Sequence, residues 1–342
     1  MRDGDRGMRD EERSRRLSSL VPQPSTLASV LLPPLAWLSR ALPPPLAQRL
    51  GAAVGDLLFW CVRRYREVAR RNLRQAFGWG APRVEAVARQ VFRSIGKSLV
   101  EFLRLPALSA AEIRDLCQLE GMEHLRAGLA AGRGVLLITA HYGSWELLAA
   151  RLVVEGIPLS VVARDADDVA THALINRIRA RCGYRVIPRQ AAPRGVLEAL
   201  RRNEVVGILM DQNTTQGGVF VPFFGRAAAT ATGPAVFALR TGAALLPGFA
   251  VRQPDDRHVG RFSPLVSLPR TADREADVRE LTARLTALIE AQVRADPTQW
   301  FWIHDRWRHR PPEERGRAGA ALRQPGGVNS HDDVSPHPAT EP

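Results

Sequence analysis

Several motifs that mark common enzyme classes are missing from this chain. It has no G-x-S-x-G turn, which exposes a nucleophilic serine, and no H-E-x-x-H pair of zinc ligands. Glycine-rich phosphate-binding loops are also absent. Its 3 cysteines (Cys61, Cys117 and Cys182) are far apart and form no C-x-x-C pair, so we expect reduced thiols in a cytoplasmic setting. We therefore expect neither a metal nor a cofactor.

Lysine is scarce, although the chain is strongly basic. The 48 basic residues include a single lysine, Lys97, and outnumber 35 acidic ones, which leaves a net charge of +13. This excess indicates an anionic partner such as a membrane surface, a nucleic acid or a phosphorylated substrate. Arginine suits phosphate because its donors form a fork. No recognition helix, RNA-binding strand signature or zinc spacing is present, so we expect no nucleic-acid partner.

No uninterrupted apolar run is long enough for a membrane span. The charged first 20 residues lack the apolar centre of a signal peptide. The apolar run 27–38 contains Pro33 and Pro34 and is shorter than the roughly 20 residues that a span needs. A second apolar run, 50–62, leads directly into a cluster of arginines. This pattern favours helices that lie in the membrane interface, and the alternative is a buried hairpin with a basic solvent face.

Charge, composition and the spacing of apolar runs divide the chain into four regions. We expect a disordered charged N-terminus (1–20), a helical membrane-associating region (21–118), an α/β catalytic domain (119–310) and a disordered tail (311–342). In the third region, short apolar runs alternate with amphipathic segments, which predicts an α/β sheet flanked by helices. The expected strands are 134–140, 159–163, 184–187 and 205–210, and the expected helices are 144–155, 168–182 and 193–202.

Two polar side chains end predicted strands. His141 follows the strand 134–140, and Asp211 follows the strand 205–210, where ligands bind in open α/β sheets. Ser144 is a natural helix N-cap, which places Glu146 in the first helical turn. A carboxylate bonded to one ring nitrogen of His141 leaves the other nitrogen free to take a proton from a hydroxyl. Alternatively, His141 is a polar strand end and Glu146 a solvated helix residue.

Five blocks in this order resemble the bacterial lipid A biosynthesis acyltransferases, within the lysophospholipid acyltransferase superfamily. Together they span roughly residues 60–310. The blocks are Arg71–Phe77, Leu119–Glu146 with its H-x-x-x-x-E motif, Glu204–Gln212, Val219–Pro234 with its phenylalanine pair, and the tryptophan-rich Gln299–Trp307. The resemblance implies a mixed sheet flanked by helices, of the glycerolipid acyltransferase type.

The resemblance also implies a reaction and a place. A fatty acyl chain passes from a thioester, on acyl carrier protein or coenzyme A, to a hydroxyl of an anionic phosphorylated lipid. The expected acceptor is a lipid A precursor, and the expected location is the cytoplasmic face of the bacterial inner membrane. Relatives that acylate lysophospholipids or phosphatidylinositol mannosides supply one alternative. A non-catalytic protein that binds membrane lipid is the alternative from a different class.

The catalytic roles are carried over from the family. His141 is the implied general base with Glu146 as its partner, and Asp211 is also required. The implied mechanism is direct attack by the acceptor without an acyl-enzyme.

The substrate-binding residues follow by the same match. The family's arginine pair corresponds best to Arg177 and Arg179, with Arg177 the first choice. Arg164, just after the second strand, matches an arginine suited to phosphate, and Gln212 is expected to bind substrate beside Asp211.

For the other residues of these blocks we expect mainly structural roles. We expect the aromatic side chains of 300–307 to pack mainly in the core, and His304 to be structural. The pair Phe223–Phe224 is expected in a loop over the site. Asp305 stands where many relatives carry a basic residue, and Asn213 where an acid is common.

Overall fold

The computed structural model describes residues 24–164, 169–215 and 217–311. The terminal segment 1–20 and the tail beyond 311, for which we expect disorder, lie outside these residues. The helices are α2 (Pro24–Ala41), α3 (Pro44–Cys61), α4 (Arg63–Phe77), α5 (Ala81–Arg104), α6 (Ala110–Leu116), α7 (Met122–Ala130), α8 (Trp145–Val154), α9 (Val169–Arg181), α10 (Ala192–Arg201), α11 (Gly233–Thr241) and α12 (Arg274–Ala295), with short 3₁₀ turns η1 (Leu105–Ala107), η2 (Arg189–Ala191) and η3 (Pro297–Gln299). The strands are β1 (Cys117–Glu120), β2 (Val135–Thr139), β3 (Leu159–Ala163), β4 (Arg185–Pro188), β5 (Val205–Leu209), β6 (Gly218–Phe223), β7 (Arg226–Ala231), β8 (Ala244–Arg252) and β9 (His258–Phe262).

A 7-stranded mixed sheet forms the centre of the fold. Its order is β1-β9-β8-β2-β5-β3-β4, with β8 and β9 antiparallel and every other neighbouring pair parallel. The strands β6 and β7 form a separate antiparallel hairpin. The α/β class with a mixed sheet flanked by helices is therefore confirmed. Each strand and helix that the alternation predicts between residues 134 and 210 is present, with its ends within about one residue of the observed ones.

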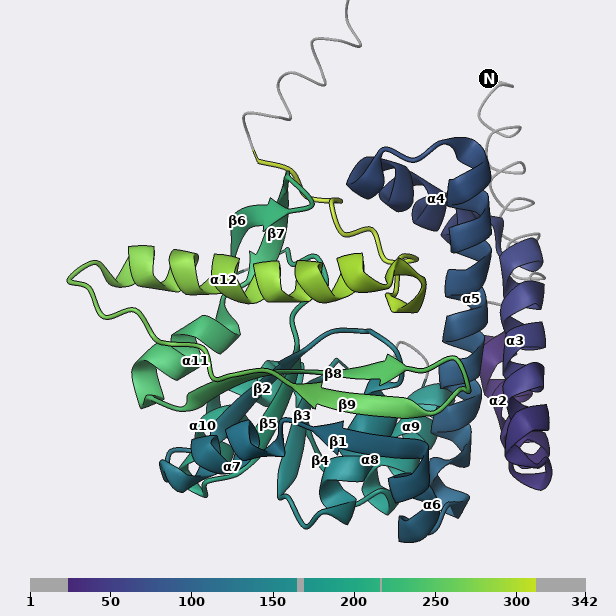
Figure 1. Ribbon diagram of the computed structural model, residues 1–342, viewed down its shortest axis with the longest axis horizontal. Helices are drawn as coiled ribbons and strands as arrows, with labels where there is room; N and C mark the ends of the chain where they lie inside the picture. Colours follow the sequence, from purple (N-terminus) through teal and green to yellow (C-terminus); the bar gives the residue numbers. More distant parts are fainter. Residues whose placement is uncertain (1–23, 165–168, 216, 312–342) are drawn as a thin grey trace, which may run out of the picture. The chain divides into compact units, whose positions relative to one another are not determined.

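The central strand β2 is covered on both faces. All of its residues are buried. Val135 and Leu137 pack with side chains of α7 and α8, while Leu136 and Ile138 pack with those of α10 and α12. Figure 1 shows α12 and α7 on opposite sides of the sheet. Because alternate side chains point to opposite faces, a strand between two helical layers is apolar throughout, as the run at 134–140 is.

The N-terminal helices pack on α5, which runs beside the sheet. Helices α2 and α3 lie on the outer side of α5 (Figure 1). Glycines let the backbones of α3 and α5 touch: a Cβ at Gly55 would lie 2.3 Å from the Phe92 carbonyl oxygen, and one at Gly96 only 2.1 Å from that of Gly51. Among the residues described, no helix is long and apolar enough to span a membrane.

Candidate active site

His141 and Asp211 meet just beyond the carboxyl ends of two neighbouring strands. Strands β2 and β5 pair with Thr139 opposite Leu209, so the residues that follow them emerge side by side. His141 Nδ1 lies 2.9 Å from Asp211 Oδ1, and the His141 backbone N–H donates to Asp211 Oδ2 at 3.0 Å. The sequence prediction that both residues occupy the same edge of the sheet is confirmed.

Asp211 is held in its ionised form by three donors. Besides the two from His141, the indole Nε1–H of Trp300 donates to Oδ2 at 2.8 Å. Asp211 is only 3% exposed. Burial by itself raises the pKa of this carboxyl, but the nearby His141 and the hydrogen bonds outweigh it and lower the pKa overall. A carboxylate only accepts hydrogen bonds, so His141 Nδ1 carries a proton, and in the neutral imidazole Nε2 is the nitrogen with the lone pair.

Glu146 occupies the predicted place on α8 but has different partners. It lies in the first helical turn, as expected. Its carboxylate accepts hydrogen bonds from Arg179, the shortest at 2.5 Å, and from the hydroxyl of Tyr184. The expected pairing of His141 with Glu146 is wrong for this structure, because Asp211 occupies Nδ1 and α9 presents a guanidinium to Glu146.

Charge and burial tie Glu146, Arg179 and Tyr184 into one unit. Burial favours a lower pKa for Arg179, but the charge of Glu146 and the hydrogen bonds to it raise that pKa overall. Burial, followed by the negative charge of Glu146, raises the pKa of Tyr184 well above its ordinary value of 10.0. Tyr184 therefore stays protonated, and its hydroxyl donates a hydrogen bond to Glu146.

Ser144 takes the helix N-cap position without performing the capping bond. The structure places it immediately before α8, as predicted, but its side chain caps no backbone N–H. Its hydroxyl instead helps to lower the pKa of the buried Glu101 carboxyl. Ser144 is itself only 2% exposed, which argues further against a nucleophilic role.

The tryptophan-rich block both fills the core and supports the site. Trp300 and Trp302 are buried, as expected for core packing. Phe301 lies against the His141 ring, with centroids 5.7 Å apart, and its N–H donates to the His141 carbonyl at 3.1 Å. The bond from Trp300 to Asp211 was not predicted, because an indole N–H near a carboxylate leaves no pattern in a tryptophan-rich core segment.

His304 is structural, as predicted. Its Nε2 accepts the backbone N–H of Asn213 at 2.8 Å, and burial lowers its pKa to about 4. The expectation for Phe223 and Phe224 was wrong. Both are buried against tryptophans of the 300–307 block, because the β6–β7 turn folds toward the core rather than over the site.

A cavity of about 590 Å³ opens beside His141. This volume lies within the usual range for small-molecule sites. Glu146 and Gln212 also line it, and the Gln212 amide nitrogen lies 3.5 Å from His141 Nε2. Its apolar walls come from both layers of the fold, and include Leu137, Leu148, Leu159, Val161, Leu209, Met210 and Phe237.

Three arginines give the cavity a basic side. Arg164, Arg179 and Arg189 contribute to its lining, and Arg189 was missed because it follows a short strand with no motif. Arg177, the first choice from the sequence, is exposed on α9 and is not among the described residues that line the cavity. Helical spacing explains the difference, since residues two apart on a helix point in different directions.

Comparison with known protein families gives a match over most of the chain. A family model described as bacterial lipid A biosynthesis acyltransferase matches residues 19–309 of the chain.

The chain belongs to this acyltransferase family.

Curated relatives of the acyltransferase carry related names. It is 30% identical to the lipid A biosynthesis lauroyltransferase of Escherichia coli, over 80% of this chain and 89% of that protein. It is 29% identical to the lipid A biosynthesis palmitoleoyltransferase of the same organism, over 81% and 90%. It is also 27% identical to a phosphatidylinositol mannoside acyltransferase of Mycolicibacterium smegmatis, over 70% and 79%. An acyltransferase that acts on a lipid acceptor is the function these names share.

The N-terminal block of the acyltransferase has a structural role beside the site. Asn72 is buried in α4, and its amide donates to the carbonyls of Trp302 and His304 at 2.8 and 2.7 Å. Arg71 forms an ion pair with Asp305 at 2.8 Å. The departure at Asp305 is thus matched by a basic partner within the same chain.

Proposed function

We propose that this acyltransferase moves a fatty acyl chain from an acyl thioester, carried on acyl carrier protein, to a hydroxyl of a lipid A precursor. His141 is the general base. The observation that carries the proposal is the His141–Asp211 pair. Asp211 binds Nδ1 of His141, and the imidazole lines an apolar cavity that has arginines in its wall.

The reaction needs one proton to move twice. His141 Nε2 takes the proton of the acceptor hydroxyl as its oxygen attacks the thioester carbonyl carbon. The ionised Asp211 stabilises the imidazolium that forms, without itself taking the proton. The C–O bond forms, the C–S bond breaks, and the imidazolium returns the proton to the departing thiolate. No covalent enzyme intermediate is required.

Different parts of the cavity wall suit different parts of the substrate. The leucine and valine side chains of β2, β3, β5 and α8 provide the surface on which an acyl chain is buried. Arg164, Arg179 and Arg189 provide positive charge for phosphate groups, either of the acceptor or of the donor's carrier arm. Arg179 is also bound to Glu146, so its guanidinium is held in one orientation.

Two variants of the dyad test the mechanism. We expect His141→Ala and Asp211→Asn each to lower kcat by roughly 10²–10⁴-fold, the usual contribution of general-base catalysis. The assay is transfer of labelled acyl chain to the lipid by purified protein. His124→Ala, on the half-exposed surface of α7, is the matched control and should keep full activity. Near-normal transfer by His141→Ala would contradict the mechanism.

Some of the relatives support an alternative acceptor class. Relatives named phosphatidylinositol mannoside acyltransferase match 70% of the chain. Their similarity keeps a phosphoinositol glycolipid as the alternative acceptor. Mass spectrometry of membrane lipids from a deletion strain distinguishes the two, because the missing acyl chain lies on different lipids. It also gives the chain length.

We propose that the enzyme acts on the cytoplasmic face of the bacterial inner membrane. Large apolar side chains are exposed on α2 and α3, with Trp37 at 72%, Trp60 at 61% and Leu57 at 62%. Exposed arginines lie on the same helices and at the start of α4, including Arg40, Arg49, Arg63 and Arg64. Exposed tryptophans beside arginines support binding in the interface of an anionic bilayer.

A further inference from the structure

A buried ion pair lies behind the turn that carries His141. Glu101 of α5 and Arg252 of β8 form a two-pronged contact in which each side chain is only 8% exposed. Burial by itself raises the pKa of Glu101, but the charges of Arg252 and His258 outweigh it and lower the pKa to about 2. The pair takes no part in lining the cavity beside His141, so the proposed reaction leaves its purpose unexplained.

A short hydrogen-bond chain connects this pair to the turn. Arg252 donates to Ser98 Oγ at 3.0 Å, and Ser98 in turn donates its hydroxyl proton to the Gly143 carbonyl at 2.8 Å. Gly143 is two residues from His141. Its N–H donates to the carbonyl of Gln299 at 3.0 Å, so the backbone donor and the backbone acceptor of Gly143 are both hydrogen-bonded.

The turn has little freedom to rearrange. Gly143 has φ of +57°, which favours glycine, and a Cβ there would lie 1.8 Å from the Ala250 carbonyl oxygen. Gln299, which accepts from Gly143 through its backbone, also exchanges two side-chain hydrogen bonds with the Arg252 backbone, at 2.8 and 3.0 Å. Strand β8, helix α5 and the C-terminal block therefore all contact Gly143.

We propose that Ser98, supported by the Glu101–Arg252 pair, is a positioning residue that fixes the His141 turn relative to the cavity. The inference rests on the proposed role of His141 as the base. Ser98 touches neither His141 nor the cavity lining, so it acts through the backbone. Small displacements of a catalytic base cost large rate factors, up to about 10²-fold for 1 Å.

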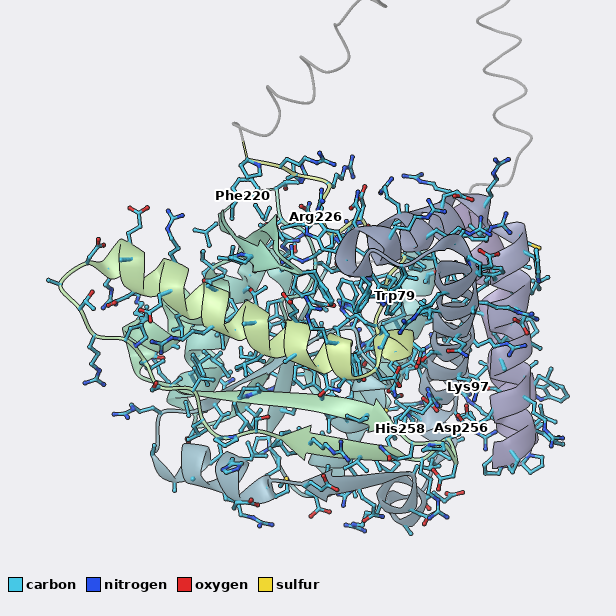
Figure 2. The ribbon with its side chains drawn as sticks, turned by 45° about the horizontal axis from the view of Figure 1, so that its top comes forward. Trp79, Lys97, Phe220, Arg226, Asp256 and His258 are labelled. Carbon is cyan, nitrogen blue, oxygen red and sulfur yellow. The ribbon has the colours of Figure 1, made fainter. Side chains whose placement is uncertain are left out.

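A neighbouring ion pair gives a matched control. Lys97, adjacent to Ser98 on α5, binds Asp256 of the β8–β9 hairpin at 2.6 Å. Figure 2 shows Lys97 beside Asp256 and His258 at this joint. The pair links α5 to the same hairpin but makes no hydrogen bond with the turn 141–144. Lys97→Gln therefore shows how kcat responds when the contact between α5 and the β8–β9 hairpin is weakened but the hydrogen bonds to the turn are kept.

The experiment compares kcat and KM in the full-length enzyme. Ser98→Ala removes one oxygen, and we expect kcat to fall about 10–100-fold while KM for donor and acceptor stays within about twofold. Lys97→Gln should leave kcat within about twofold, and the melting temperatures of both variants are measured so that loss of stability can be compared with loss of kcat. A kcat for Ser98→Ala that stays near wild type, or that merely follows Lys97→Gln, would overturn the inference.

His141→Ala, measured beside these variants, separates the two claims. If His141→Ala loses transfer while Ser98→Ala keeps a normal kcat, only the positioning role of Ser98 is contradicted. Normal transfer in His141→Ala removes the proposed function itself.

Discussion

At the scale of single residues, the site contains two carboxylates that have different hydrogen-bond partners. Asp211 is buried and bound by His141 and Trp300, so it can orient the imidazole and stabilise its charge. Glu146 faces Arg179 and Tyr184 on the cavity wall instead. The environment of each carboxylate, rather than its distance from His141 along the chain, decides which one binds the imidazole.

The Glu146–Arg179 contact predicts strong coupling between these two residues. Both side chains are mostly buried, at 13% and 16% exposed, so removing one leaves the other charge unpaired. We expect Glu146→Gln and Arg179→Gln to be non-additive, with a coupling free energy of about 1–3 kcal/mol in the activation barrier for kcat/KM. A double-mutant cycle measures it.

The control for this cycle lies on the same helix. Arg177 is exposed on α9, so Glu146→Gln and Arg177→Gln should add within about 0.5 kcal/mol. Equal coupling of Glu146 to both arginines would mean that the observed ion pair is not the source of the effect.

At the scale of secondary-structure elements, the helical layer α2–α5 contacts the turn that carries His141 on one side and exposes apolar side chains on the other. Its inner helix α5 carries Ser98 and Glu101, which reach the catalytic turn. Its outer helices α2 and α3 expose large apolar side chains. The close approach of α3 and α5 depends on glycines, since a Cβ at Gly51 would lie 2.6 Å from the Lys97 Cα. The exposed apolar surface of α2 and α3 is thus separated from the site by one helix, α5.

The outer helices predict membrane binding through their tryptophans. We expect the double variant Trp37→Ala/Trp60→Ala to bind vesicles containing phosphatidylglycerol at least about tenfold more weakly, because both rings are exposed and apolar. Sedimentation with the vesicles measures the affinity. Val236→Ala, a change at an exposed apolar residue on α11, is the control and should bind normally. Unchanged binding by the double variant would place the contact elsewhere.

At the scale of the whole molecule, buried ionisable groups determine the response to acid. His258 is 1% exposed, and burial lowers its pKa to about 4 from an ordinary value of 6.5. Between these values the unfolded chain binds a proton that the folded chain does not, so stability falls as the pH decreases from 6.5 to 4. The nearby Glu101 keeps its charge over this range, since its pKa is about 2.

The expected size of this effect is measurable. From pH 7 to pH 5, His258 should cost about 2 kcal/mol of the free energy of unfolding. Urea denaturation of His258→Gln should therefore show a pH dependence smaller by that amount. His124→Gln, half-exposed on α7, should retain the wild-type dependence. Equal pH dependence in all three proteins would mean that His258 is protonated in the folded state.

Much of the fold follows from local pattern. The strands and helices between residues 134 and 210 were predictable because buried parallel strands are continuously apolar and their helices are amphipathic. The edge position of His141 and Asp211 followed from where their strands end. The placement of Ser144 before α8 and the structural role of His304 needed only local rules and composition.

The pairing of side chains was decided by tertiary structure alone. That Asp211 rather than Glu146 binds His141 depends on which strands are neighbours and on Arg179 and Tyr184, which lie far along the chain. The bond from Trp300 joins residues 89 positions apart. The H-x-x-x-x-E motif therefore determined where the site lies, whereas the packing of distant elements determined which groups lie in contact. Hydrogen bonds require distances and angles that spacing along a chain does not specify.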